Sequence, residues 1–189
     1  MSDRAHSMSA ATKALATIIK PLTGREERSA IKAATTSLRA NLSDRFRVLG
    51  TELRIDKPAP GKHPDRLVGV YIVDYVNDRS IEALVGARGE LVAVNDLPPH
   101  QVPISGDEVR EAQTVAARDE AVARAVKRHK ATFVSPFTPH DHASKKRVVG
   151  LRYFSTDRRR RLSPRPIGEV EVDLGTRSVR FTAIDAEDE

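Results

Sequence analysis

Two stretches of the chain repeat their apolar residues at the period of a helix, and each is followed by stretches that alternate at the period of a strand. The first helical stretch places Ile31, Ala34, Leu38 and Leu42 on one face. The second places six apolar residues on one face: Val109, Ala112, Val115, Ala116, Val122 and Val126. Asp119 stands inside this second stretch, where it can end one helix and cap another. Both stretches therefore predict helices that pack one side against a core.

Both helical stretches begin with the same signal. Thr23 stands three residues before Glu26, and Ser105 stands three residues before Glu108. In a capping box of this kind the hydroxyl accepts from a free amide of the first turn, and the carboxylate accepts from the amide of the capping residue. The two boxes are 82 residues apart, which indicates an internal duplication.

Four runs typical of strands follow each helical stretch. They cover residues 46–55, 67–76, 80–85 and 90–94, and then residues 131–137, 147–154, 167–174 and 178–184. The third run of the second set alternates most regularly, because Val170 and Val172 face one way and Glu169 and Glu171 the other. Such alternation is typical of antiparallel strands with one buried face. The predicted fold class is therefore α+β, with two tandem domains that each pack a helix on a four-stranded antiparallel sheet.

These elements set the predicted domain boundaries. The chain divides into an N-terminal extension, two similar helix-plus-sheet domains and an acidic tail, which cover residues 1–20, 21–98, 99–185 and 186–189. The extension is expected to be helical over residues 10–20. The proline-rich stretch 97–103 is expected to link the two domains.

Charge is concentrated in one segment. The 189 residues include 32 Lys and Arg against 26 Asp and Glu and no cysteine, which excludes disulfides and thiolate metal sites. Residues 145–165 hold nine basic residues and one acidic residue, a net charge of +8. The candidates for binding an anion or an acidic partner are Lys145, Lys146, Arg147, Arg158, Arg159, Arg160 and Arg161. The alternative is a solvated hairpin tip whose charges guard against aggregation.

Two further partner classes are not favoured. Aromatic residues make up 4% of the chain and tryptophan is missing, so a surface that stacks nucleic-acid bases is not expected, although backbone contacts to nucleic acid stay open. No apolar run approaches the length that spans a bilayer. The sequence therefore predicts a cytoplasmic protein without membrane segments.

Candidate sites are few. His140 and His142 have the spacing of two metal ligands on a strand, but they lie in a polar loop, so the sequence predicts neither a metal site nor a cofactor. Glu169 and Glu171 are expected to pair across strands with Arg177 or Arg180. The candidates for a pocket on a sheet face are Tyr71, Tyr75, Tyr153 and Phe154.

Ordered landmarks in the sequence resemble the second and third N-terminal domains of copper amine oxidases. In that family a hairpin similar to residues 80–94 runs into a proline-rich entry similar to Pro103-Ile104, and a later hairpin is similar to residues 165–174. The resemblance covers about residues 21–185 and implies two cystatin-like domains. The family's catalytic residues have no match, because Tyr71, Tyr75 and Tyr153 are not preceded by Asn.

The resemblance implies a non-catalytic binding or assembly module. Such a module would dock on a separately encoded oxidase-like chain or associate with itself. The first alternative is a module that binds a polyanion or an acidic partner through residues 145–165. The second is a small enzyme that uses a pocket on a sheet face, although no residue pattern names a reaction, so the sequence favours a protein without catalytic activity.

Overall fold

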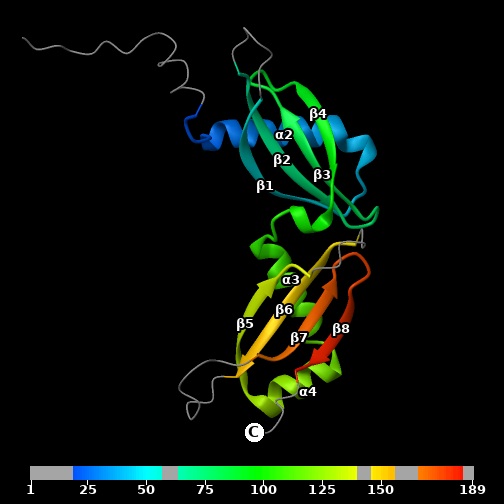
Figure 1. Ribbon diagram of the computed structural model, residues 1–189. Helices are drawn as coiled ribbons and strands as arrows, with labels where there is room; N and C mark the ends of the chain where they lie inside the picture. The colour runs from blue at the N-terminus through cyan, green and yellow to red at the C-terminus, as the bar shows by residue number, and fades with distance from the viewer. Residues whose placement is uncertain (1–18, 57–63, 140–145, 156–165, 185–189) are drawn as a thin grey trace, which may run out of the picture. The chain divides into compact units, whose positions relative to one another are not determined.

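The computed structural model describes residues 19–56, 64–139, 146–155 and 166–184. The fold is α+β, with two four-stranded antiparallel sheets that are each packed with helices (Figure 1). The strand order is β1-β2-β3-β4 in the first sheet and β5-β6-β7-β8 in the second. The predicted fold class is thereby confirmed, and each sheet follows the order of its strands along the chain.

The elements lie close to their predicted positions. The helices are α2 (Gly24–Leu38), α3 (Gly106–Ala116) and α4 (Glu120–His129), with short 3-10 turns at Arg39–Asn41 and Pro99–Gln101. The first sheet comprises β1 (Phe46–Ile55), β2 (Arg66–Asp74), β3 (Arg79–Val85) and β4 (Leu91–Leu97). The second comprises β5 (Ala131–Phe137), β6 (Val148–Ser155), β7 (Pro166–Asp173) and β8 (Ser178–Ala183). Strand β4 runs three residues beyond its predicted end at Val94.

The compact units of the structure are discontinuous in sequence. Unit 1 consists of residues Met1–Asn41, Gly50–Tyr71 and Glu82–Asn95. Unit 2 consists of residues Leu42–Leu49, Ile72–Ile81 and Asp96–Glu189. Unit 2 therefore includes the start of β1 and the turn that joins β2 to β3. The predicted boundaries at residues 21, 98 and 185 stay a prediction. The predicted helix over residues 10–20 lies almost entirely outside the described residues, as does the acidic tail.

Both predicted helix starts are confirmed. The Thr23 and Glu26 pair closes a capping box at α2, with 3.3 Å from the Glu26 amide to the Thr23 hydroxyl and 2.7 Å from the Thr23 amide to the Glu26 carboxylate. Ser105 and Glu108 close the same box at α3. Asp119 accepts from the first amides of α4, so the second helical stretch is divided where its sequence indicated.

The second sheet buries the face that its alternation predicts. Val170 and Val172 in β7 are fully buried, and Glu169 and Glu171 are partly exposed. Helix α3 packs against β6, β7 and β8, and α4 packs against β5 and β7. Asp173 belongs to the outward series but is 7% exposed. The reason is that its carboxylate accepts from the amides of Gly175 and Thr176 and so closes the β7–β8 turn.

The described part of unit 1 is organised by α2. This helix turns Ala30, Ala34 and Leu38 inward, and Figure 1 shows it lying across one face of the first sheet. The valines of β2 and the alternating apolar residues of β3 are buried as well. Small residues on α2 allow the helix to approach a sheet rich in branched side chains closely. In the described part of the chain no helix has both the length and the apolar character of a membrane span.

One glycine of the second sheet is required by an aromatic neighbour. Gly150 in β6 pairs directly with Phe137 in β5, and a Cβ added at Gly150 would lie 2.6 Å from the Phe137 ring. The Arg152 guanidinium lies 4.8 Å from the centre of the same ring. The Phe137 ring therefore lies against the backbone of Gly150 and within cation–π distance of Arg152.

We expect Gly150→Ala to lower the free energy of unfolding by about 1–3 kcal/mol, because the added methyl group must displace the ring. Urea-induced unfolding measures the change. Gly50→Ala is the matched control, since Gly50 also lies inside a strand but has no atom within 4 Å of an added Cβ. That variant should be neutral or more stable by about 0.4–1 kcal/mol. Equal losses in both variants would contradict the packing argument.

Candidate functional site

A buried ion pair organises the centre of unit 2. The Arg147 side chain is 3% exposed and that of Glu108 is fully buried, with 2.8 Å between Arg147 Nε and Glu108 Oε1. Arg147 also donates to the carbonyls of Pro99, Val102 and Pro103, at 2.5, 2.9 and 2.8 Å. One guanidinium thus joins the start of β6 to the residues that lead into α3. We call Glu108, Arg147 and these carbonyls the inner clamp.

The same contacts recur in unit 1. Arg66 Nε lies 3.2 Å from Glu26 Oε1, and Arg66 Nη1 and Nη2 donate to the carbonyls of Lys20 and Pro21. We call this the outer clamp. Each of its carbonyls lies 82 residues before a carbonyl of the inner clamp, and the corresponding guanidinium nitrogens make the corresponding bonds. The repeat first seen in the capping boxes therefore extends to a tertiary contact.

The two clamps differ in burial and in what they hold. Thr23, through its amide and hydroxyl, and Arg66 lower the pKa of Glu26 from 4.5 to about 2. Burial raises the pKa of Glu108, but Arg147, the Ser105 amide and the Tyr75 hydroxyl outweigh it and hold the pKa below its ordinary value. The Tyr75 hydroxyl donates to Glu108 Oε1 at 3.0 Å. Burial and the Glu108 charge raise the pKa of Tyr75, so this hydroxyl keeps its proton.

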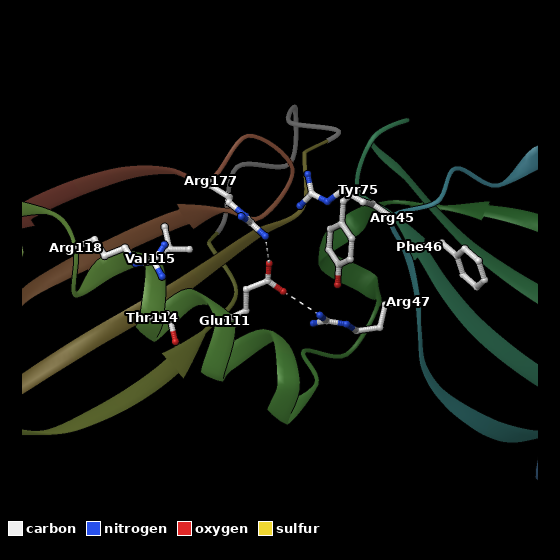
Figure 2. A pocket seen from close by; sticks show the side chains of 9 residues that line it. All are labelled: Arg45, Phe46, Arg47, Tyr75, Glu111, Thr114, Val115, Arg118 and Arg177. Atoms are coloured by element: carbon white, nitrogen blue, oxygen red, sulfur yellow. Dashed lines mark hydrogen bonds and ion pairs between the residues drawn. The ribbon is translucent and has the colours of Figure 1, made fainter.

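Tyr75 contacts the inner clamp through its hydroxyl and also lines a pocket. The pocket has a volume of about 450 Å³ and lies within unit 2, and Figure 2 shows the side chains that line it. The lining comes from the start of β1, the β2–β3 turn, α3 and the β7–β8 turn: Arg45, Phe46, Arg47, Tyr75, Glu111, Thr114, Val115, Arg118 and Arg177. We call it the arginine pocket, because four of these nine residues are arginines.

Three of the arginines are fixed by defined partners. Arg45 donates to the carbonyls of Leu174 and Gly175, both at 3.0 Å. The Glu111 carboxylate lies between Arg47, at 2.9 Å, and Arg177, at 3.7 Å (Figure 2). The Arg47 guanidinium also lies 5.6 Å from the centre of the Tyr75 ring. The pocket therefore holds three of its four arginines in place before any ligand arrives.

The remaining donors of the pocket are unused. Arg47 Nη1 is buried and has no hydrogen-bond partner among the described residues. Burial opposes the charge on Arg47, but Tyr75, Glu111 and Glu108 outweigh it, so the pKa of Arg47 is raised. The Arg118 guanidinium has no hydrogen bond or ion pair in the part of the chain that the structure describes. An anion that enters the pocket would find the Arg118 guanidinium available.

A second pocket of unit 2 has balanced charge. It has a volume of about 330 Å³ and is lined in part by His100, Lys146, Glu171, Asp173 and Arg180. Glu171 pairs with Arg180, and Lys146 Nζ lies 3.5 Å from Asp173. Because these charges neutralise one another, this pocket has less attraction for an anion than the arginine pocket.

The predicted aromatic candidates do not form one site. Tyr75 lines the arginine pocket. Tyr71 belongs to unit 1, where its hydroxyl donates to Glu52 and accepts from Arg54, and its pKa is raised to about 12 by burial and by Glu52. Tyr153 is 8% exposed, and burial raises its pKa. Phe154 follows it on the opposite face of β6.

Of the predicted basic candidates, the structure describes Lys146 and Arg147. The sequence grouped Arg147 with exposed cations, but the structure buries it in the inner clamp, so it is not presented to an external anion. Lys146 is exposed and faces Asp173. Lys145 and Arg158–Arg161 lie outside the described residues, and so do His140 and His142. Among described residues no group of three His, Cys, Asp or Glu is arranged to hold a metal ion. The predicted cross-strand pairing of Glu171 with Arg180 is confirmed. Glu169 pairs instead with Arg152.

The lining of the arginine pocket was missed in the sequence, apart from Tyr75. A partial signal was present on α3, where Glu111 and Val115 stand four residues apart and so share one face. That face lies beside the apolar stripe formed by Ala112 and Ala116. Arg118 follows in the turn after this helix. The arginines at positions 45, 47 and 177 carry no local signal, because long-range contacts bring them together.

The chain matches no family model, and no curated protein sequence matches it.

We expect Glu108→Gln to lower the free energy of unfolding by about 3–5 kcal/mol, since it leaves the buried Arg147 charge without its counter-ion. Thermal or urea unfolding at pH 7 gives the value. Glu26→Gln makes the same change in the outer clamp, where solvent reaches the pair, and should cost clearly less. A loss as large in Glu26→Gln would show that burial does not distinguish the two clamps.

The pH dependence of the free energy of unfolding tests the outer clamp in a second way. The folded-state pKa of Glu26 lies below its ordinary value, so its contribution to stability is complete above pH 4.5 and is lost as the pH falls towards about 2. Stability should therefore fall less between pH 4.5 and pH 2 in Glu26→Gln than in the unaltered chain.

Proposed function

We propose that the chain is a non-catalytic binding module that takes a small anion in the arginine pocket. The observation that carries this proposal is the grouping of four arginines around one carboxylate in a pocket of about 450 Å³. Guanidinium groups are the preferred ligands of carboxylates and phosphates, because their planar donors match such anions. This site differs from the basic segment 145–165, which the sequence offered as an alternative for binding anions.

The lining supports binding rather than catalysis. Thr114, the one aliphatic hydroxyl among the described lining residues, donates to the carbonyl of Arg110. The Tyr75 hydroxyl is committed to Glu108. No described lining residue therefore pairs a nucleophile with a base, which a catalytic site for acyl or phosphoryl transfer would need.

Inorganic phosphate tests this proposal. We expect it to bind in calorimetric titration at low ionic strength, and to bind more weakly as sodium chloride is added, since salt screens exposed charges. Arg118→Ala should weaken binding about tenfold, the size of one charge-assisted hydrogen bond.

Arg128→Ala is the matched control for Arg118→Ala. Arg128 is also an exposed arginine, but it lies on α4 and does not line the pocket. Its removal changes the net charge equally and should leave phosphate affinity unchanged. Equal weakening in both variants would indicate general attraction by a basic protein, and the absence of phosphate binding would refute the site.

A second candidate function is self-association, which the resemblance to amine oxidase N-terminal domains also implies. The observation that favours it is the edge strand β4 of the first sheet, where Val92 and Val94 are 53% and 36% exposed. Exposed edge strands with apolar side chains pair with strands of other chains. The same resemblance also predicts docking on a separately encoded oxidase-like chain.

We expect sedimentation equilibrium to show a dimer that dissociates in Val94→Lys, because a charge on an edge strand opposes pairing. Val76→Lys is the control, since Val76 is 59% exposed and lies in the β2–β3 turn rather than on an edge. A monomeric mass for the unaltered chain at high concentration would rule out self-association.

A further inference from the structure

The net charge of the arginine pocket indicates how many charges its ligand carries. Arg45, Arg47, Arg118 and Arg177 contribute four positive charges, and Glu111 contributes the negative one among the lining residues. A monovalent anion would leave most of this charge uncompensated. A ligand with two or more negative charges matches it better, because like charges in a partly enclosed site repel one another until they are neutralised.

The directions of the free donors indicate the shape of the charged group. Glu111 already presents a planar carboxylate, with one oxygen to Arg47 Nη2 and the other to Arg177 Nη2. The Arg118 guanidinium, in the turn that follows α3, is the one that has no partner among the described residues, whereas Arg47 Nη1 is buried. A tetrahedral phosphate group offers three terminal oxygens in different directions, so one can accept from Arg118 while the others face the charges of the remaining arginines.

The remaining surface of the pocket is apolar. Figure 2 shows Phe46, Val115 and the Tyr75 ring among the lining side chains. A volume of about 450 Å³ falls in the range of pockets that hold small organic ligands, which far exceed a bare ion in size. The ring of Tyr75 is fixed at its hydroxyl by Glu108, so it forms a rigid wall for a planar or apolar group.

We infer that the arginine pocket binds a phosphate monoester, as its dianion, with a small aromatic or apolar group on the ester oxygen. The inference rests on the proposed anion-binding function and adds the class of ligand. The phosphate meets the Arg118 guanidinium and the positive charge of the other three arginines, and the organic group lies against Val115 and the Tyr75 ring. Glu111 holds Arg47 and Arg177 in place but opposes the ligand through its own charge.

Phenyl phosphate is the probe, and inorganic phosphate and benzenesulfonate are its two comparisons. We expect phenyl phosphate to bind at least about tenfold more tightly than inorganic phosphate in calorimetric titration, because the ring buries apolar surface. Benzenesulfonate has the ring and a tetrahedral head but one charge, and it should bind more weakly than phenyl phosphate. The affinity of phenyl phosphate should fall below about pH 6, where the monoester gains a proton, and that of benzenesulfonate should change less.

Two variants and one further ligand complete the test. Arg118→Ala should weaken phenyl phosphate about tenfold, and Arg128→Ala should not. Glu111→Gln should tighten it by about two- to fivefold, the effect of removing one partly exposed like charge. Phthalate supplies a dianion of two carboxylates on a ring. If phthalate binds as tightly as phenyl phosphate, the choice of a phosphate group is overturned.

The outcomes separate this inference from the proposed function. Binding of inorganic phosphate that depends on Arg118 supports the anion site whatever the ester does. If phenyl phosphate then binds no more tightly than inorganic phosphate, the ester is excluded and the anion site stands. If neither binds, both proposals fail.

Discussion

The structure depends most on a guanidinium that is held by the third residue of a helix. Arg147 uses its nitrogens to bind Glu108 and three carbonyls ahead of α3, so a single side chain fixes where the helix begins relative to β6. Burial makes this contact decisive, because a charge that loses its partner in the interior costs far more than one at the surface. The capping box, the ion pair and the Tyr75 hydroxyl all converge on one carboxylate, which therefore links local helix structure to the wall of the pocket.

Much of the fold was predictable because its signals are local. The capping boxes at Thr23 and Ser105 depend on residues three positions apart, and the alternation in β7 depends on neighbours two positions apart. The role of Arg147 was not predictable in this way. Arg147 follows two lysines in the sequence. A run of basic residues has the same sequence pattern whether all of them are solvated or one is buried against a carboxylate 39 residues away. The outer clamp was not predicted for the same reason, since Arg66 and Glu26 are 40 residues apart.

The repeat shows how one arrangement can serve two environments. The outer clamp is open to solvent, and the Glu26 carboxylate there binds the capping amide, the Thr23 hydroxyl and Arg66. In the inner clamp the corresponding carboxylate is buried and also accepts from Tyr75. Duplication accounts for the shared contacts, and burial accounts for the difference, because a buried carboxylate needs further donors to satisfy its oxygens. The tyrosine that supplies one of them is also the residue that reaches the arginine pocket.

The arrangement of the arginine pocket is easier to explain by a ligand than by stability. Four guanidinium groups around one carboxylate repel one another, and burial of Arg47 Nη1 without a partner adds a cost that solvent would otherwise remove. The other arginines have compensating partners: Arg45 binds carbonyls and Arg177 faces Glu111. The Arg118 guanidinium, which has no partner among the described residues, is then the group that gains most when an anion binds, so the excess of positive charge that weakens the empty pocket also favours a charged ligand.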